Sequence, residues 1–474
     1  MNFRKIFKTY SFLILAQSIG LILSVVLTFI LPKYLSMKSF GFWQLFLFYS
    51  SYVGFFHFGV NDGVYLRYGG KNFYRQNFSL LKSQFYLLFL LQCFVAIIGF
   101  VVVYFFLNKD QNYNFVIFCT LAFLIISNLS SFLTILLQAV NRLREFSIVT
   151  IVINISMILL LLILILSKNF EYRHYIKFYI LAYIVGFAVS IYYSRKIFFV
   201  SINTKKIKFY VREFYKNMSV GIKLLISNVA GLLIYGIGRF LIEKGWSIEE
   251  FGKVSLAISL AFFLIFFMKQ GSLVLFPVLK NVKASGQKYF FSKSTVLLNV
   301  LLPGLLLFFP AMAFFILHWL PKYESVIFYL VLFLPSLIYE GKMQIVHSTL
   351  LKALRMETML LKINVVSVFV SLLLCLAGYY YFKSIPFILL SVNIAIVSRC
   401  LLFEYILNKK FNHKNFVQEL FCLVLSAAFI ILYSNFDYIL AFFVYICIYT
   451  LYLFYNRYLL INSYHFLKKK FRSR

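Results

Sequence analysis

Apolar blocks of transmembrane length recur along the whole chain, and they constrain the fold more than any other feature. Hydrophobic residues make up 62% of the 474 residues, and the mean hydropathy is +0.89, whereas a soluble domain is about 45–50% apolar. A helix needs about 20 apolar residues to cross a bilayer, so the sequence predicts an all-α integral membrane protein with about fourteen transmembrane helices. We place them at residues 11–31, 40–60, 85–107, 115–138, 146–166, 176–194, 219–242, 251–276, 295–317, 325–345, 359–382, 385–407, 417–433 and 438–460.

The net charge of +33 would suggest nucleic-acid binding if the protein were soluble. Here Lys and Arg come in short clusters between the apolar blocks, and rich and poor segments alternate. With the N-terminus inside, the inner segments carry far more Lys and Arg than the outer ones, as the positive-inside rule requires. We therefore predict that both termini are cytoplasmic, that the number of spans is even, and that nucleic acid is not a partner.

The six cysteines give no sign of a metal site, a disulfide or another cofactor. All six lie inside apolar blocks, where cysteine behaves as a small hydrophobe, and no two have CxxC spacing. The N-terminal segment has the basic and apolar regions of a signal peptide, but its apolar part is too long and lacks a small-residue cleavage site. We interpret it as a retained first span.

A short polar motif occurs once in each half of the chain. KYLSMKSFGFW begins at Lys33 and KGWSIEEFGKV begins at Lys244, so that Phe251 follows Phe40 by 211 residues. The same offset aligns small and amide residues in the apolar blocks on either side. Late in the next block, HFGVND in the first half is matched by MKQGS in the second, which indicates a polar notch in each half.

An internal repeat of six helices keeps the same orientation in both halves. Parallel repeats related by a pseudo-two-fold axis along the membrane normal are a transporter architecture, with a cleft between two bundles. The predicted parts are a six-helix bundle at 1–195, a basic cytoplasmic linker at 196–217, a second six-helix bundle at 218–410, and two further helices with a basic cytoplasmic tail at 411–474.

These motifs resemble a known family. LPKYLSMKSFGFWQLFLF and FHFGVNDGVYLRYGG are similar to the N-terminal signature of bacterial polysaccharide flippases, the O-antigen or capsule repeat-unit exporters of the multidrug/oligosaccharidyl-lipid/polysaccharide exporter superfamily. SVGIKLLISNVAGLLIYGIGRFLIEK and the FGKVSLAISL that follows are similar to the second-half signature. The resemblance covers residues 1–280 and continues beyond them mainly in the span pattern. One departure is Gly238, where the family often has Asp before the arginine aligned with Arg239.

The resemblance implies a flippase that moves an undecaprenyl-diphosphate-linked oligosaccharide from the inner to the outer leaflet of the bacterial cytoplasmic membrane by alternating access. The implied partners are that lipid-linked glycan and membrane lipids, together with a polysaccharide polymerase and chain-length machinery. The alternative is a cation-coupled multidrug or small-molecule exporter of the same superfamily. An enzyme is disfavoured, because no long outer loop exists and because His57 and Asp62, five residues apart, would lie on different faces of a helix.

A diphosphate cargo needs cationic side chains that face a polar cavity. The substrate-binding candidates are Lys269, Gln270, Ser272, Arg239, Lys223 and Arg67. Lys269 is the first of them, because it lies within a span beside a polar notch, although it can also snorkel or make a helix contact. Arg239 and Lys223 can likewise snorkel from near a helix end, and Arg67 can be a plain topology charge.

Carboxylates inside a membrane are candidates for proton or sodium coupling. Asp62 is the first coupling candidate, with the capping of an inner helix end as its alternative role. His57 is the second, with structural packing as its alternative.

Two other charged positions are interpreted as structural ion pairs. We expect Glu340 to pair with Lys342, and Arg399 to pair with Glu404 five residues further on.

Overall fold

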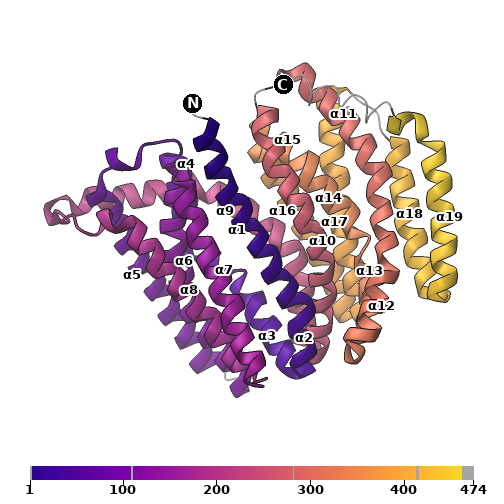
Figure 1. The fold of residues 1–474 in the computed structure, drawn as a ribbon, viewed down its shortest axis with the longest axis horizontal. Helices are drawn as coiled ribbons and strands as arrows, with labels where there is room; N and C mark the ends of the chain where they lie inside the picture. Colours follow the sequence, from indigo (N-terminus) through magenta and orange to yellow (C-terminus); the bar gives the residue numbers. More distant parts are fainter. Residues whose placement is uncertain (1–2, 108–109, 281, 413–415, 462–474) are drawn as a thin grey trace. The chain divides into compact units, whose positions relative to one another are not determined.

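The computed structural model describes residues 3–107, 110–280, 282–412 and 416–461 (Figure 1). Within these ranges, the side chains of residues 3–10, 106–107, 266–267, 269–274, 276–278, 280 and 416 lie outside the description. Every regular element in the described ranges is a helix. The all-α class is therefore confirmed.

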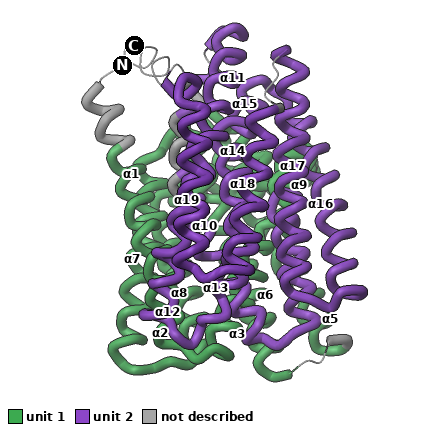
Figure 2. The backbone as a smooth tube through the Cα atoms, turned by 90° about the vertical axis from the view of Figure 1, so that its right-hand side faces the viewer, with its two compact units in different colours: residues 1–229 green, residues 230–474 purple. Residues whose placement is uncertain are grey.

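The chain forms two compact units, residues 1–229 and 230–474, which Figure 2 colours green and purple. The first unit contains α1 (Phe3–Val25), η1 (Val26–Ile30), α2 (Leu31–Tyr34), α3 (Met37–Ser50), η2 (Val53–His57), α4 (Val60–Tyr68), η3 (Phe73–Arg75), α5 (Phe78–Val102), η4 (Val103–Leu107), α6 (Gln111–Ala139), α7 (Leu143–Leu166), α8 (Tyr172–Ser194), η5 (Arg195–Ile197), η6 (Thr204–Lys206) and the first part of α9 (Ile207–Gly245). Within it, α6 packs against α4, α5 and α8, and α7 packs against α1 and α8.

The second unit begins within α9, a single helix whose residues fall in both units. It continues with α10 (Ile248–Lys280), α11 (Ala284–Leu301), η7 (Leu302–Phe308), α12 (Phe309–Trp319), η8 (Pro321–Tyr323), α13 (Val326–Phe333), α14 (Ser336–Lys342), η9 (Met343–His347), α15 (Ser348–Ala353), α16 (Glu357–Tyr380), α17 (Ile385–Phe411), α18 (Phe416–Asn435) and α19 (Tyr438–Tyr455). Here α10 packs against α13, α14 and α15, and α17 packs against α14 and α16. The predicted limits at residues 195, 217 and 410 stay a prediction.

Eleven helices in the described ranges are long and apolar enough to cross a membrane, or up to twelve if the bent pair of α13 with α14–α15 is one span. The predicted spans outside this set are 40–60 and 251–276, the second helix of each half. The first of these is broken into α3, η2 and α4. The second lies in α10, where many side chains are outside the description. The count of fourteen and the cytoplasmic termini stay predictions.

The two copies of the polar motif have the same local structure. The Ser36 hydroxyl oxygen accepts a hydrogen bond from the backbone N–H three residues on at 3.1 Å, and the Ser247 hydroxyl does the same at 3.2 Å. Such a serine satisfies an amide that a helix N-terminus leaves unpaired. Four residues after each serine, Phe40 and Phe251 are fully buried. α3 and α10 therefore begin at positions that the 211-residue offset relates, as the predicted repeat requires.

The two second helices differ beyond this shared start. α10 continues as one helix to Lys280, whereas the first-half chain leaves α3 at Ser50 and restarts as α4 at Val60. Between them Phe58 and Gly59 have φ angles of 48° and 84°, a left-handed region that glycine adopts freely and phenylalanine does not. The notch is thus a backbone break in the first half but not in the second.

α4 lies directly against the first part of α9, backbone to backbone. A methyl group on Gly63 would lie 2.6 Å from the carbonyl carbon of Asn217, and one on Gly59 would lie 2.6 Å from the backbone nitrogen of Ile222. A methyl group on Gly221 would in turn overlap the backbone of Gly59 and Gly63. Small residues four apart permit this close approach of membrane helices. The broken helix is therefore held on α9 by three glycines.

Candidate functional site

Buried amide side chains satisfy the backbone at the break in the first half. Gln92 of α5 donates to the Phe56 carbonyl at 2.8 Å, and Asn128 of α6 donates to the Val53 carbonyl at 2.9 Å. Asn128 also donates to the Gln92 side-chain oxygen at 2.6 Å, and Asn61 donates to the Asn128 carbonyl at 3.2 Å. All three amides are at most 1% exposed. The interior of a bilayer contains no water to bond the free carbonyl groups, so a helix break there requires donors from the protein itself.

The break brings the two predicted coupling residues together. His57 Nδ1 accepts a hydrogen bond from the Gly59 N–H at 3.1 Å, so the neutral imidazole carries its hydrogen on Nε2. Nε2 lies 3.8 Å from Asp62 Oδ2. The expectation that these residues lie on different helix faces is wrong, because it assumed a continuous helix and the chain reverses its φ angles between them.

Arg67 at the end of α4 is held by α9. Its guanidinium donates to the Glu213 carboxylate, to the Glu213 carbonyl at 3.3 Å and to the Asn217 side-chain oxygen at 2.5 Å. Glu213 also lies 3.9 Å from Lys216. Arg67 is thus an interhelical contact as well as a basic group, and its side chain keeps 22% exposure.

Arg239 and Lys223 occupy different environments on α9. The Arg239 guanidinium donates to the Ser255 hydroxyl at 2.9 Å and lies over the Phe251 ring, whereas Lys223 is exposed. At Gly238, the position where the resembling family often has Asp, an added methyl group would lie 2.7 Å from the Val392 side chain. An acidic side chain at that position would require the Val392 side chain of α17 to shift.

Lys269, Gln270 and Ser272 lie within α10. Their side chains are outside the description. The prediction that they face a cavity therefore stays a prediction.

The buried ion pairs of the second unit are not the expected ones. Arg399 Nη2 donates to the Glu340 carboxylate, and the Tyr235 hydroxyl donates to the same oxygen at 2.6 Å. Lys342 instead donates to Glu419 of α18 at 2.6 Å. The expected Arg399–Glu404 pair fails for a geometric reason, because residues five apart point to different sides of the continuous helix α17.

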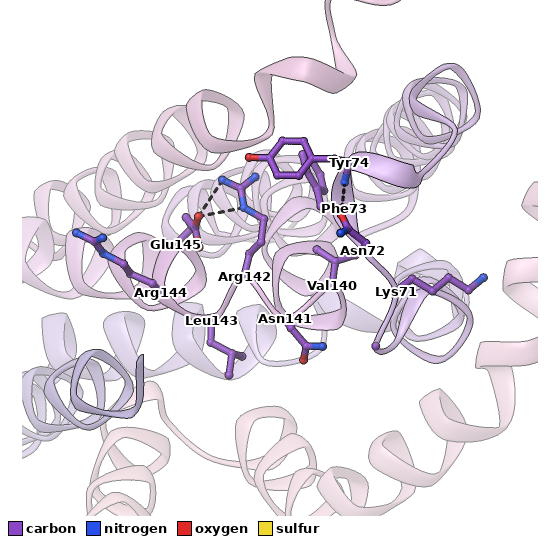
Figure 3. A pocket seen from close by; sticks show the side chains of 11 residues that line it. Lys71, Asn72, Phe73, Tyr74, Val140, Asn141, Arg142, Leu143, Arg144 and Glu145 are labelled. Atoms are coloured by element: carbon purple, nitrogen blue, oxygen red, sulfur yellow. Dashed lines mark hydrogen bonds and ion pairs between the residues drawn. The ribbon is translucent and has the colours of Figure 1, made fainter. Parts of the chain in front are cut away.

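Three basic segments predicted on the inner side meet at one end of the first unit. A cavity of about 700 Å³ is lined by residues 70–74 and 140–145 (Figure 3), and a smaller one of about 210 Å³ adds Tyr192, Tyr193, Arg195 and Lys196. Figure 3 shows Arg142 turned toward Glu145, which accepts two hydrogen bonds from it at 3.0 Å. Arg142 also donates to the Tyr193 carbonyl at 2.9 Å. The segments share one end of the unit, as the predicted topology requires.

The sequence matches a known protein family. A family model described as polysaccharide biosynthesis protein matches residues 6–244, more than half of the chain. The chain belongs to the polysaccharide biosynthesis protein family. The matched residues include residues 6–229 of the first unit, the break, and α9 up to Lys244. No curated protein matches this member of the family significantly.

Solved structures extend the likeness of this polysaccharide biosynthesis protein to the second unit. A lipid II flippase, MurJ, in an inward closed conformation is similar with a TM-score of 0.66 at 14% identity, over 96% of this chain and 100% of that one. An inward-facing multidrug resistance MATE family transporter of the MOP superfamily is similar with a TM-score of 0.61 at 12% identity, over 84% of this chain and 94% of that one. The protein therefore has the MurJ/MATE-like fold, and the proteins it resembles are transporters and flippases rather than enzymes.

Several buried polar residues of this family member were not predicted. They are Gln92, Asn128, His347 and Glu419. Each interrupts an apolar block or stands near the end of one, so a search for single amide, imidazole or carboxyl groups inside predicted spans or just beyond their ends would have found them.

Proposed function

We propose that the protein is a flippase for an undecaprenyl-diphosphate-linked oligosaccharide, an O-antigen or capsule repeat unit, in the bacterial cytoplasmic membrane. One observation carries the proposal: a chain of the polysaccharide biosynthesis protein family has the fold of a lipid II flippase along almost its whole length. Movement from the inner to the outer leaflet would proceed by alternating access, with a polysaccharide polymerase and chain-length machinery using the product.

The proposed contacts to the diphosphate are the cationic residues Lys269, Arg239, Lys223 and Arg67, with Gln270 and Ser272 beside Lys269. Arg67 is placed to exchange a carboxylate partner for a phosphate. Its guanidinium already binds the Glu213 carboxylate, and a phosphate oxygen has the charge and spacing to replace that carboxylate. Lys223 is exposed and makes no hydrogen bond or ion pair with the residues that the structure describes.

His57 and Asp62 are the proposed coupling pair of the first unit. The Asp62 carboxyl group lies beside an imidazole that carries its hydrogen on Nε2, and Nε2 is 3.8 Å from Asp62 Oδ2. Protonation of either group would change the attraction between them across the break between η2 and α4. The pair lies at the start of α4, so a change in its protonation can move that end of the helix.

Deletion of the gene in its host tests the function. We expect complete repeat units to accumulate on the lipid carrier at the inner leaflet, with loss of the surface polymer. Normal surface polymer together with altered sensitivity to cationic drugs would instead favour the MATE-like alternative, a cation-coupled multidrug or small-molecule exporter, toward which the second structural similarity points.

Lys269→Ala tests the substrate site. We expect export to be lost while the protein level in the membrane stays normal, because a diphosphate would lose its intramembrane cation. Lys288→Ala is the matched control, since Lys288 lies exposed at the start of α11. Near-normal export by Lys269→Ala would remove Lys269 from the site.

A further inference from the structure

The second unit buries a group of polar and ionisable side chains to which the proposed function has so far assigned no role. We call it the Lys342 cluster, and its members are Asn299 of α11, Lys342 of α14, His347 of η9, Glu404 of α17 and Glu419 of α18. Each is at most 5% exposed. Four helices and a π-helical turn therefore meet at one polar centre.

The two carboxyl groups of the Lys342 cluster differ in their partners. Glu419 accepts hydrogen bonds from Lys342 Nζ at 2.6 Å and from Asn299 Nδ2 at 2.5 Å. Glu404 Oε2 lies 4.0 Å from Lys342 Nζ and 3.7 Å from His347 Nε2, both beyond hydrogen-bond distance. No N–H or O–H of the described residues donates to either oxygen of Glu404, or bonds to His347 Nε2. Glu404 and His347 are thus aimed at each other without a hydrogen bond.

The described charges do not balance when both carboxyl groups are ionised. The Lys342 cluster then holds two carboxylates and one ammonium, because the adjacent Glu340 is neutralised by Arg399. One negative charge is left over deep inside a membrane protein. A buried carboxylate without a partner is costly enough that it takes up a proton instead.

The partners indicate which carboxyl group takes the proton. Two donors favour the ionised form of Glu419, whereas Glu404 accepts no hydrogen bond from the described residues and has only the Lys342 ammonium, 4.0 Å away and already bonded to Glu419, to favour its ionised form. We propose that the Lys342 cluster binds one exchangeable proton on Glu404, and that this proton is coupled to transport. The coupling part rests on the proposed function.

The same geometry offers the proton a second position. When the proton leaves the Glu404 carboxyl, His347 Nε2 can accept it, which leaves a carboxylate beside an imidazolium with the charge of the cluster unchanged. For Nε2 to accept, the ring hydrogen must be on Nδ1, and Nδ1 faces the Cys400 sulfur at 3.8 Å. The imidazole is therefore placed to relay the proton to and from Glu404.

The backbone at the Lys342 cluster can respond to the proton. Lys342 directly precedes η9 and His347 is its last residue. Two residues five apart point about 140° away from each other around an α-helix. Here both face the same Glu404 oxygen, because the π-helical turn between them is wider. The α13–α14 bend of 43° lies in the same candidate span. If η9 became α-helical, one of the two side chains would turn away from Glu404.

Other titratable groups among the described residues surround these carboxyl groups. Those not already placed in the cluster are Tyr339 on α14, Cys400 on α17, Cys422 on α18 and Tyr452 on α19. The Glu340–Arg399 pair is the neighbouring charge. α10 also packs against η9, and most side chains of its second half lie outside the description. The number of protons that the Lys342 cluster binds is therefore best measured directly.

Infrared spectroscopy of the whole protein in lipid nanodiscs gives that measurement. We expect the wild type at neutral pH to show a carboxylic-acid C=O band that shifts in heavy water and disappears in Glu404→Gln. Glu340→Gln is the matched control and should keep the band, because Glu340 is ionised in its pair with Arg399. Glu404→Asp, which keeps an acid, should move the band rather than remove it, so a folding failure of one variant does not decide the result.

Two infrared results would overturn the proton site. In the first, the Glu404→Gln spectrum keeps the acid band of the wild type and lacks a carboxylate band instead, so Glu404 would be ionised in the wild type. The other is an acid band that vanishes when sodium chloride is added at fixed pH, since the site would then take sodium rather than a proton.

Transport in vesicles tests the coupling separately. Vesicles carrying the protein and an undecaprenyl-diphosphate-linked oligosaccharide are scored by glycan exposed to an added glycosidase, with and without a pH gradient. We expect the gradient to accelerate the wild type and to leave Glu404→Gln unaffected. A wild type that ignores the gradient would overturn the coupling. A wild type that moves no glycan under any gradient, with the acid band intact, would overturn the proposed function and leave the proton site standing.

Discussion

The glycine contact between α4 and α9 can be tested with one added methyl group. In Gly221→Ala the new carbon would lie 2.9 Å from the Gly59 carbonyl carbon and closer still to its oxygen, whereas ordinary contact begins at 3.4 Å. The obstacle is backbone, so no side chain can rotate away. Overpacking of this kind costs about 1–3 kcal/mol, against a gain of about 1 kcal/mol from replacing glycine by alanine within a helix.

A second glycine of the same helix provides the control. Gly231 also lies in α9, but a methyl group there would come no closer than 4.0 Å to any neighbour. Gly231→Ala therefore gains the higher helix propensity of alanine without a steric clash. The expected difference between the two variants is about 1–3 kcal/mol, and Gly221→Ala is the less stable.

Thermal unfolding in nanodiscs measures this difference. Trp43 is fully buried in α3 of the first unit, so its fluorescence reports on the unit that contains the contact. Replacing Trp246 and Trp319 by Phe in all samples removes the signal of the second unit. We expect Gly221→Ala to unfold several degrees below Gly231→Ala. Equal unfolding temperatures would refute the backbone contact, because no rotation of a side chain could hide the clash.

The remaining predictions concern buried polar groups. Asn128→Leu is expected to lower stability by about 1–2 kcal/mol, since the Val53 carbonyl at the break loses its donor; thermal unfolding measures the loss. Arg399→Leu is expected to cost about 3–5 kcal/mol, because it leaves the Glu340 carboxylate buried without its counter-charge. The double variant with Glu340→Gln should recover part of that cost in the same assay.

Each of these predictions has its own control. Among the described residues, the Thr150 hydroxyl bonds only within its own helix, to the Phe146 carbonyl at 3.1 Å. Thr150→Val removes that hydroxyl and should therefore lower stability less than Asn128→Leu does. A loss of equal size in Thr150→Val would contradict the account of the break. For the ion pair, strictly additive losses in the double variant would mean that Arg399 and Glu340 do not interact.

Residue patterns predicted the helices but not the pairing of charges inside them. Apolar length marked nearly every span, and the polar motif repeated before α3 and α10 marked equivalent positions in the two halves, because both signals are local. The meeting of Lys342 with Glu419 joins segments far apart in the sequence, and only packing decides it. His57 and Asp62 were misjudged for a different reason, since helical periodicity was applied across a break that only the φ angles of Phe58 and Gly59 reveal.

The dependence of α4 on later helices has a consequence for how the chain enters the membrane. Its break is satisfied by Gln92 and Asn128, and its glycine face is covered by α9, all of which are synthesised after it. Until they arrive, the carbonyl groups of Val53 and Phe56 have neither those donors nor, in lipid, water. The nascent segment would therefore wait in the insertion machinery or at the membrane surface, and a chain truncated before α9 would be a quality-control substrate rather than a stable half-transporter.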